Sequence, residues 1–240
     1  MRIKVVIPIV QPLNPEFSPE ANLKELVQFK APDTEIDVVF LPNGPTSIEC
    51  YYDEVLAAAN LLDLVVHAEK SGYDGVYIDC FGDPGVRAAR ELVEIPVVGA
   101  FQPSAMVASL LASRWSIVTI LGNVVPMIHD LARLYRVEPN IISVRHINTP
   151  VLSFNHADMK MLLLEQIEKA VDEEGAEAIV LGCTGMMGLS QYLVSEMINK
   201  GKPVPIVNPS GAAIGYLELL IRNQLSQSPL AYAQAIRTNR

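Results

Sequence analysis

The chain has 240 residues, of which 50% are apolar and 19% are charged, a composition typical of an ordered globular protein. Its formal net charge of -9, without any cluster of Lys and Arg, excludes the positive surface that nucleic-acid binding requires. The three cysteines are an odd number and too few for a disulfide framework in a chain of this length, so we expect free thiols.

The N-terminal sequence shows no sign of a targeting or membrane segment. The apolar stretch from Val5 to Val10 contains Pro8, and no small-residue cleavage site follows it. No run approaches the length of about 18 apolar residues that crosses a bilayer. We therefore expect a cytoplasmic protein with no membrane partner.

Apolar runs and helical segments alternate along the first half of the chain. The run up to Val10 is typical of a buried parallel strand, and Pro8 indicates that this strand leaves the sheet near its end. Ser18 suits the N-cap of a helix, and Asp83 suits the cap of a helix that begins at Pro84. The predicted strands are 2–10, 36–41, 76–80 and 97–100, and the predicted helices are 19–29, 51–71, one from residue 84, and 103–113.

The same alternation starts again at Trp115. The second set of predicted strands is 115–121, 141–147, 179–183 and 204–208, and the helices are 125–135, 157–174, 187–199 and 212–225. The tail from Ser226 is expected to form one more short helix or to fray. Strands that alternate with helices of this length indicate parallel sheets with helices on both faces.

The two halves therefore resemble a duplicated unit. We predict an α/β fold of two pseudo-symmetric lobes, each a mostly parallel four-stranded sheet, with the active site in the cleft between them. The lobes are expected at residues 1–113 and 114–210, and residues 211–240 are expected to pack back on the first lobe. The correspondence is one of pattern, because few residues are identical between the halves.

Each half carries one cysteine at the end of an apolar run, Cys80 and Cys183. Ligands of open α/β sheets bind beyond the carboxyl ends of the strands, so the two thiols should face one pocket. A carbon held between them could lose a proton to one sulfur and receive a proton from the other, which is the chemistry of a racemase. Gly82 and Gly185 would let backbone N–H groups approach an anionic substrate.

A less specific interpretation is available for each of these residues. A lone free cysteine is usually a small buried apolar residue, but two at matching strand ends favour the acid/base role. Cys50 has no counterpart in the other half, and we interpret it as structural. The hydroxyls of Ser47 and Thr184 would either bind substrate oxygens or form turns and caps.

Metal ions and cofactors are not expected. The sequence has no Cys-x-x-Cys pair and no His pair at helical spacing, which argues against a zinc site. It also has no Gly-x-Gly-x-x-Gly fingerprint after the first strand and no phosphate-binding glycine loop, which argues against nicotinamide and nucleotide enzymes.

Four motifs stand in order along nearly the whole chain. They are Gly44-Pro45-Thr46-Ser47-Ile48-Glu49 with Tyr52-Asp53-Glu54, then Cys80-Phe81-Gly82-Asp83-Pro84-Gly85 with Ala88-Ala89-Arg90-Glu91, then Pro96-Val97-Val98-Gly99, and finally Leu181-Gly182-Cys183-Thr184-Gly185-Met186. Together they resemble the hydantoin racemase family of the aspartate/glutamate racemase superfamily.

The resemblance implies a cofactor-independent racemase of 5-substituted hydantoins, often a homo-oligomer, whose only ligand is a small molecule. Cys80 and Cys183 would be the catalytic pair. The implied substrate-binding residues, which include the backbone N–H groups that would hold the ring carbonyls, are Ser47, Ile48, Phe81, Thr184, Gly185 and Gln102.

This chain departs from the family pattern at three places that we expect to line the cleft. The segment from Ile7 to Pro12 replaces a loop rich in Asn, Gln102 replaces a Glu, and Asn208 replaces an acid. These departures concern the substrate rather than the chemistry at the two cysteines. The open alternatives are a racemase of allantoin, aspartate or glutamate, a maleate isomerase or decarboxylase, and a two-lobed sensor of small molecules without turnover.

Overall fold

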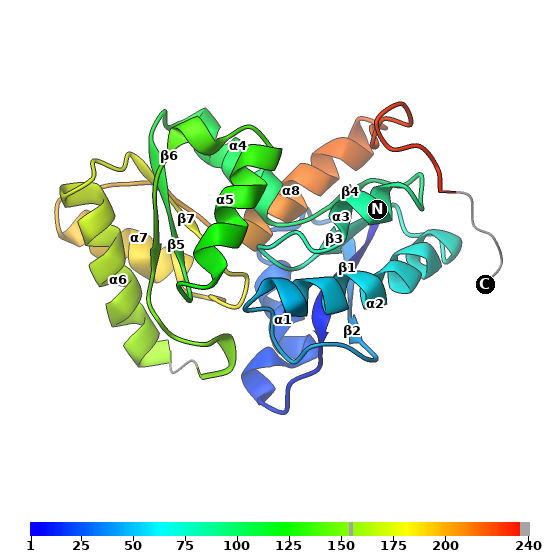
Figure 1. Cartoon of the computed structure of the whole chain (residues 1–240), viewed down its shortest axis with the longest axis horizontal. Coiled ribbons are helices and arrows are strands. Elements are labelled where there is room, and N and C mark those ends of the chain that lie inside the picture. The colour runs from blue at the N-terminus through cyan, green and yellow to red at the C-terminus, as the bar shows by residue number, and fades with distance from the viewer. Residues whose placement is uncertain (154–155, 236–240) are drawn as a thin grey trace.

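The computed structural model describes residues 1–153 and 156–235 (Figure 1). Two four-stranded parallel sheets form the centre of the molecule, with strand orders β2-β1-β3-β4 and β6-β5-β7-β8. The orders are identical when the second set is renumbered, so the predicted α/β fold of two similar lobes is confirmed. Within the described residues, no helix is long and apolar enough to cross a membrane.

The first lobe runs β1, η1, α1, β2, α2, β3, α3, β4, α4. These elements are Arg2–Val10, Pro15–Phe17, Pro19–Leu26, Glu35–Leu41, Tyr51–Lys70, Gly75–Ile78, Val86–Arg90, Val97–Val98 and Phe101–Leu111. Ser18 caps α1 as predicted, because its side chain accepts the N–H of Ala21 at 3.2 Å. Pro8 lies within β1, and the register with β2 shifts between Ile7 and Val10.

The second lobe runs β5, α5, η2, β6, η3, α6, β7, α7, β8, α8. These elements are Trp115–Thr119, Val124–Leu134, Glu138–Asn140, Ile141–His146, Val151–Ser153, His156–Asp172, Ala178–Leu181, Ser190–Asn199, Ile206–Val207 and Pro209–Arg222. The strands that precede the two cysteines are completely buried, which explains their continuous apolar sequence.

A single hydrophobic core joins the lobes. Helix α4 packs on β7 and β8 of the second sheet, whereas α8 packs on β3 and β4 of the first sheet. Figure 1 shows α8, in orange, lying between the two halves. Buried residues of both sheets and both helices form this core, among them Val5, Tyr77, Phe101, Trp115, Val180 and Leu217. Each lobe therefore covers the other with its last helix.

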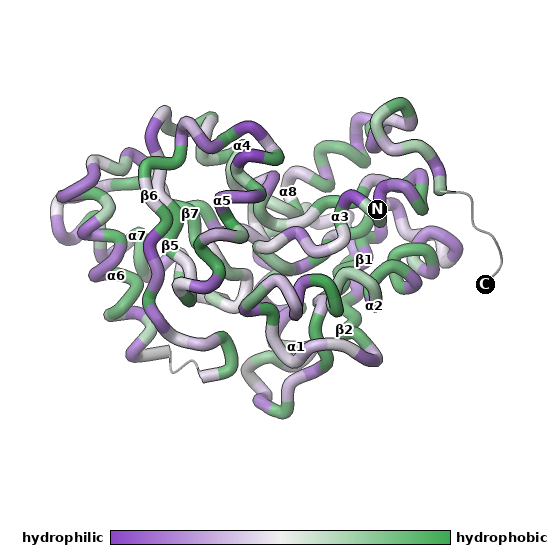
Figure 2. Tube along the Cα trace, viewed as in Figure 1, coloured by the Kyte–Doolittle hydropathy of each residue, from purple (hydrophilic) through white to green (hydrophobic). Residues whose placement is uncertain are grey.

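Two further cores lie on the outer faces of the sheets. Helices α2 and α3 cover the first sheet around Leu61 and Val65, and α6 and α7 cover the second sheet around Leu163 and Leu193. Figure 2 shows that hydrophobic stretches follow the central strands, while hydrophilic ones recur in the peripheral loops. The arrangement gives both sheets an apolar layer on each face.

Two details of the sequence prediction are corrected here. Asp83 does not cap the helix that follows it; the residue before α3 is Gly85, and the Asp83 carboxylate instead accepts the N–H of Phe101, at 2.8 Å, at the start of α4. The segment after α8 forms no helix up to residue 235. It runs along the first lobe, where Gln227 donates to the carbonyls of Val93 and Ile95 at 2.8 and 2.9 Å.

Candidate active site

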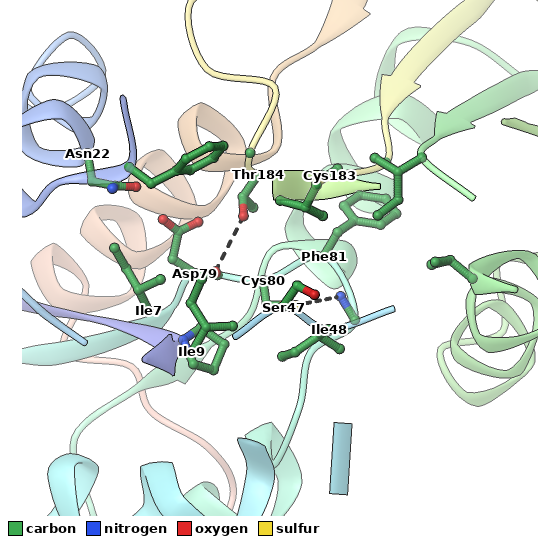
Figure 3. A pocket seen from close by; sticks show the side chains of 18 of the residues that line it. Ile7, Ile9, Asn22, Ser47, Ile48, Asp79, Cys80, Phe81, Cys183 and Thr184 are labelled. Atoms are coloured by element: carbon green, nitrogen blue, oxygen red, sulfur yellow. Dashed lines mark hydrogen bonds between the residues drawn. The ribbon is translucent and has the colours of Figure 1, made fainter. Parts of the chain in front are cut away.

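One cavity lies where the carboxyl ends of β1, β3, β5 and β7 face each other, and both predicted cysteines line it (Figure 3). Its empty volume is about 780 Å³, part of which is open to solvent. The wall is mostly apolar. It consists of Ile7, Pro8, Ile9, Phe17, Asn22, Phe40, Ser47, Ile48, Asp79, Cys80, Phe81, Gly82, Ile120, Val124, Met127, Val151, Gly182, Cys183, Thr184 and Gly185.

Cys80 lies two residues beyond the end of β3 and is half-buried. Its Sγ atom accepts the backbone N–H of Gly82 at 3.4 Å. Burial raises the pKa of the Cys80 thiol well above its usual value, the Gly82 N–H opposes this shift, and the nearby Cys183 adds to it. Both cysteines line the same cavity.

Cys183 occupies the equivalent position after β7 in the second lobe. Burial raises the pKa of its thiol to about 12, with the backbone N–H of Gly185 acting in the opposite direction. The residue before it must be glycine, because a Cβ atom at Gly182 would lie 2.7 Å from the side chain of Ile117. The loop is also fixed by Thr119, whose hydroxyl donates to the Gly182 carbonyl at 2.9 Å.

The two cysteine loops are joined directly. The hydroxyl of Thr184, the residue after Cys183, donates to the backbone carbonyl of Asp79, the residue before Cys80, at 3.3 Å. Figure 3 shows this bond crossing from one loop to the other. A second link between the lobes runs from the backbone N–H of Val151 to the Glu49 carboxylate at 3.0 Å. These contacts fix the distance across the cavity.

Asp79 is a cavity residue that the sequence analysis overlooked. The residue is only 7% exposed, and Oδ1 accepts the Tyr77 hydroxyl at 2.7 Å. Burial raises the pKa of this carboxyl to about 6, against hydrogen bonds from Tyr77 and Thr184 that lower it. The available signal was an acidic residue within an otherwise apolar run that ends at a candidate catalytic cysteine.

Comparisons with known proteins agree with this geometry. Residues 20–217 match the family model described as Asp/Glu/Hydantoin racemase. The chain belongs to this family. It is 35% identical to a hydantoin racemase from a Pseudomonas strain over 92% of this chain and 86% of the relative, and 36% identical to one from Rhizobium meliloti over 83% and 81%. Among solved structures, an allantoin racemase from Klebsiella pneumoniae superposes with a TM-score of 0.91, at 32% identity, over 100% of this chain and 95% of that one.

The chain is thus a racemase, as the sequence predicted. In this racemase, five of the six residues proposed to bind substrate do line the cavity: Ser47, Ile48, Phe81, Thr184 and Gly185. Cys50 lies outside the lining, at the start of α2, and its thiol donates to Asp53 at 3.2 Å. That contact agrees with the structural role assigned to it.

Gln102 and Asn208 do not line the cavity, contrary to expectation. The Gln102 side chain is turned away by Arg90, whose guanidinium donates to its amide oxygen at 3.0 Å beside a different cavity. Asn208 caps α8, because its amide oxygen accepts the N–H of Gly211 at 3.0 Å, and its amide nitrogen donates to Glu25 at 3.1 Å. The divergent first segment does reach the cavity, through Ile7, Pro8 and Ile9.

Proposed function

We propose that this protein racemises 5-substituted hydantoins, with Cys80 and Cys183 acting on opposite faces of ring carbon C5. The observation that carries the proposal is that two thiols, one from each lobe, line a single cavity. The similar hydantoin racemases supply the substrate class, because a hydantoin racemase inverts a ring carbon next to a carbonyl. The shared cavity supplies one acid/base group for each face of that carbon.

The reaction consists of two proton transfers. One cysteine, as a thiolate, takes the proton from C5, and the electron pair of the C–H bond moves into the adjacent carbonyl to give an enolate. The other cysteine, as a thiol, then gives its proton to the opposite face of C5 and becomes the thiolate. Because burial raises the pKa of both thiols, each thiolate is a stronger base than that of free cysteine, which suits a weakly acidic carbon.

The negative charge on the enolate oxygen needs donors that are already in place. The cavity lining includes Ser47 and the two residues that follow the cysteines, Phe81 and Thr184, and we propose their hydroxyl and backbone N–H groups as these donors. Fixed donors of this kind stabilise a developing oxyanion without reorganisation. The apolar wall formed by Ile7, Ile9 and Ile48 is suited to the substituent on C5.

Allantoin is a second candidate substrate. It is itself a hydantoin that carries a ureido group on C5, and the similar solved structure is an allantoin racemase. The chemistry at C5 would be the same, and only the surroundings of the substituent would differ. An apolar wall next to the cysteines favours an alkyl or aryl substituent over the ureido group.

Loss of optical rotation from enantiopure substrates tests the proposal. The substrates are a 5-benzyl hydantoin, a 5-isopropyl hydantoin and allantoin, each incubated with wild type, Cys80→Ser and Cys183→Ser. We expect the wild type to racemise hydantoins and each serine variant to lose activity by at least about 100-fold. Cys50→Ser is the matched control, because this thiol lies outside the cavity, and it should remain active. Normal rates in both cavity variants would contradict the proposal.

A further inference from the structure

The cavity has one polar corner in an otherwise apolar wall. We use this name for Asn22, Asp79 and Thr184, which come from α1, the Cys80 loop and the Cys183 loop. Figure 3 shows the Asp79 carboxylate pointing into the space between the other two residues. The sequence indicated no role for this carboxylate, and the two-thiol reaction does not use it.

We propose that Asp79 is a substrate-binding residue that accepts a hydrogen bond from the ring N1–H group of the hydantoin. The inference rests on the proposed function and adds to it the orientation of the ring. Three observations support it: the position of the carboxylate, its ability to accept a further hydrogen bond, and the chemistry of the ring atoms.

The position of Asp79 relates it to both sulfur atoms. It is the chain neighbour of Cys80, so the two Cα atoms lie about 3.8 Å apart. It is also tied to the Cys183 loop through the bond from Thr184 to its carbonyl. Consistent with this place, the carboxyl acts electrostatically on the thiols of both Cys80 and Cys183. Because the Asp79 carboxylate is near both thiols, it is also near the ring atoms bonded to C5, the carbon held between them.

The carboxylate can still accept hydrogen bonds from a molecule in the cavity. The Tyr77 hydroxyl is held at 2.7 Å from Oδ1, and hydrogen bonds from the Thr184 and Ser210 side chains also lower the pKa of this carboxyl. A carboxylate has about four lone-pair positions on its two oxygens, so one position remains for a further donor. No donor with a positive charge forms a salt bridge to Asp79 within residues 1–153 and 156–235. A carboxyl that is 7% exposed gains by pairing with an N–H group.

The ring chemistry selects the atom. A hydantoin presents two carbonyl oxygens, which a carboxylate would repel, and two N–H groups, which it would attract. N1 is bonded directly to C5, whereas N3 lies between the two carbonyl carbons and is remote from C5. With C5 held between the two sulfurs, the N–H group that is adjacent to Asp79 is N1–H. The C4 carbonyl is then free to face the backbone N–H groups at the cysteine loops.

N-methylated substrates and Asp79→Asn together test the proposal. Rates are measured for a 5-benzyl hydantoin and its 1-methyl and 3-methyl derivatives with both proteins. Asparagine keeps the shape of aspartate and can still accept the Tyr77 hydroxyl. In the wild type we expect 1-methylation to lower kcat/KM by about 10- to 100-fold, the range for a hydrogen bond to a charged group. In Asp79→Asn the same methyl group should lower kcat/KM by less than about 3-fold, because the hydrogen bond from N1–H to residue 79 is already weakened in this variant.

The outcomes separate this inference from the proposed function. If the wild type racemises no hydantoin, the proposed function fails. If the wild type is active and 1-methylation affects both proteins equally, or if the coupling appears only with the 3-methyl compound, the assignment of Asp79 to N1–H is overturned. If Asp79→Asn does not fold, the wild type alone still tests the assignment of Asp79 to N1–H. Equal rates with the 1-methyl and 3-methyl compounds would overturn it.

Discussion

The cavity thiols are the residues on which the proposed reaction depends, and their surroundings make them weak acids. Both lie among apolar side chains, and each receives one backbone N–H, from Gly82 or Gly185, that partly offsets the loss of water. A free cysteine titrates near pH ~8.5. In the empty protein we therefore expect both to be protonated at neutral pH, so one thiol must release its proton to solvent when substrate binds before the first transfer can occur.

Ultraviolet absorbance of the thiolate tests this expectation. Because burial raises the pKa of Cys183 to about 12 and that of Cys80 further, the difference between wild type and each cavity serine variant should show no titration below pH ~9. Cys50→Ser provides the reference for a thiol outside the cavity. A difference signal with a midpoint below that of free cysteine would show that the backbone donors outweigh burial.

Asp79 provides a second prediction at the scale of one residue. Burial raises its pKa in the folded state to about 6, above the value of about 3.9 expected when unfolded. A carboxyl shifted in this direction favours folding fully below its unfolded pKa, and that contribution is lost as pH rises through the folded pKa. The loss amounts to about 3 kcal/mol for a shift of this size.

Denaturant unfolding at pH ~4 and ~7.5 measures this effect. Asparagine cannot ionise, so the stability of Asp79→Asn relative to wild type should improve by about 1–3 kcal/mol between the lower and the higher pH. The comparison removes the contribution of all other titrating groups, which the two proteins share. If the difference in the free energy of unfolding between Asp79→Asn and wild type were the same at both pH values, the raised pKa of Asp79 would be contradicted.

At the scale of elements, helix α4 depends on an acid that lies far from it in the sequence. The Asp83 carboxylate accepts the N–H groups of Phe101 and Gln102 at 2.8 and 3.3 Å. Gly99 makes room for this contact, because a Cβ atom there would lie 2.1 Å from Asp83 Oδ1. Asp83 thus connects the loop after Cys80 to the helix that packs on the second lobe.

Asp83→Ala should therefore destabilise the fold by about 1–3 kcal/mol, through loss of the helix cap and of buried acceptors. Denaturant unfolding of wild type, Asp83→Ala and Ser18→Ala measures the effect. The cap at Ser18 is local to α1, and its removal should cost about 1 kcal/mol. If Asp83→Ala lowered the free energy of unfolding by less than Ser18→Ala does, the role of Asp83 as the cap of α4 would be contradicted.

The periodic elements were predictable from the sequence, whereas several residue contacts were not. Apolar runs located the central strands β1, β3, β5 and β7, and β1 was predicted with its observed bounds, because burial on both faces requires such runs. Asp83, Gln102 and Asn208 were misplaced because their partners, Phe101, Arg90 and Glu25, come from other elements. The cavity position of Asp79 was missed for a different reason, because the alternation of side chains along β3 does not continue beyond Ile78.

At the scale of the whole molecule, the exchange of helices makes the two lobes dependent on each other. Leu217 of α8 packs on β3 of the first lobe, where a Cβ atom at Gly75 would lie 2.9 Å from its side chain. It belongs to the same core as Trp115 in β5, which is fully buried in the second lobe. The cavity between the lobes is thus supported by a continuous core.

Leu217→Ala tests this dependence. Removing the side chain should lower the free energy of unfolding by about 2–5 kcal/mol. Because the chain has a single tryptophan, fluorescence of Trp115 reports on the second lobe, while far-ultraviolet circular dichroism reports on the whole chain. Both transitions should shift together. A Trp115 transition that remains at its wild-type position would show that the lobes unfold independently.

The central claim is that two sulfur atoms act on opposite faces of one carbon, and isotope incorporation in D₂O tests it most directly. An enantiopure hydantoin is incubated with the wild type, and both enantiomers are analysed for deuterium in the first few per cent of reaction. The donor thiol has exchanged with solvent, while the other holds the proton of the substrate. We therefore predict deuterium in the product and protium in the remaining substrate. Early deuterium in both enantiomers at the same rate, or protium retained in the product, would contradict the account.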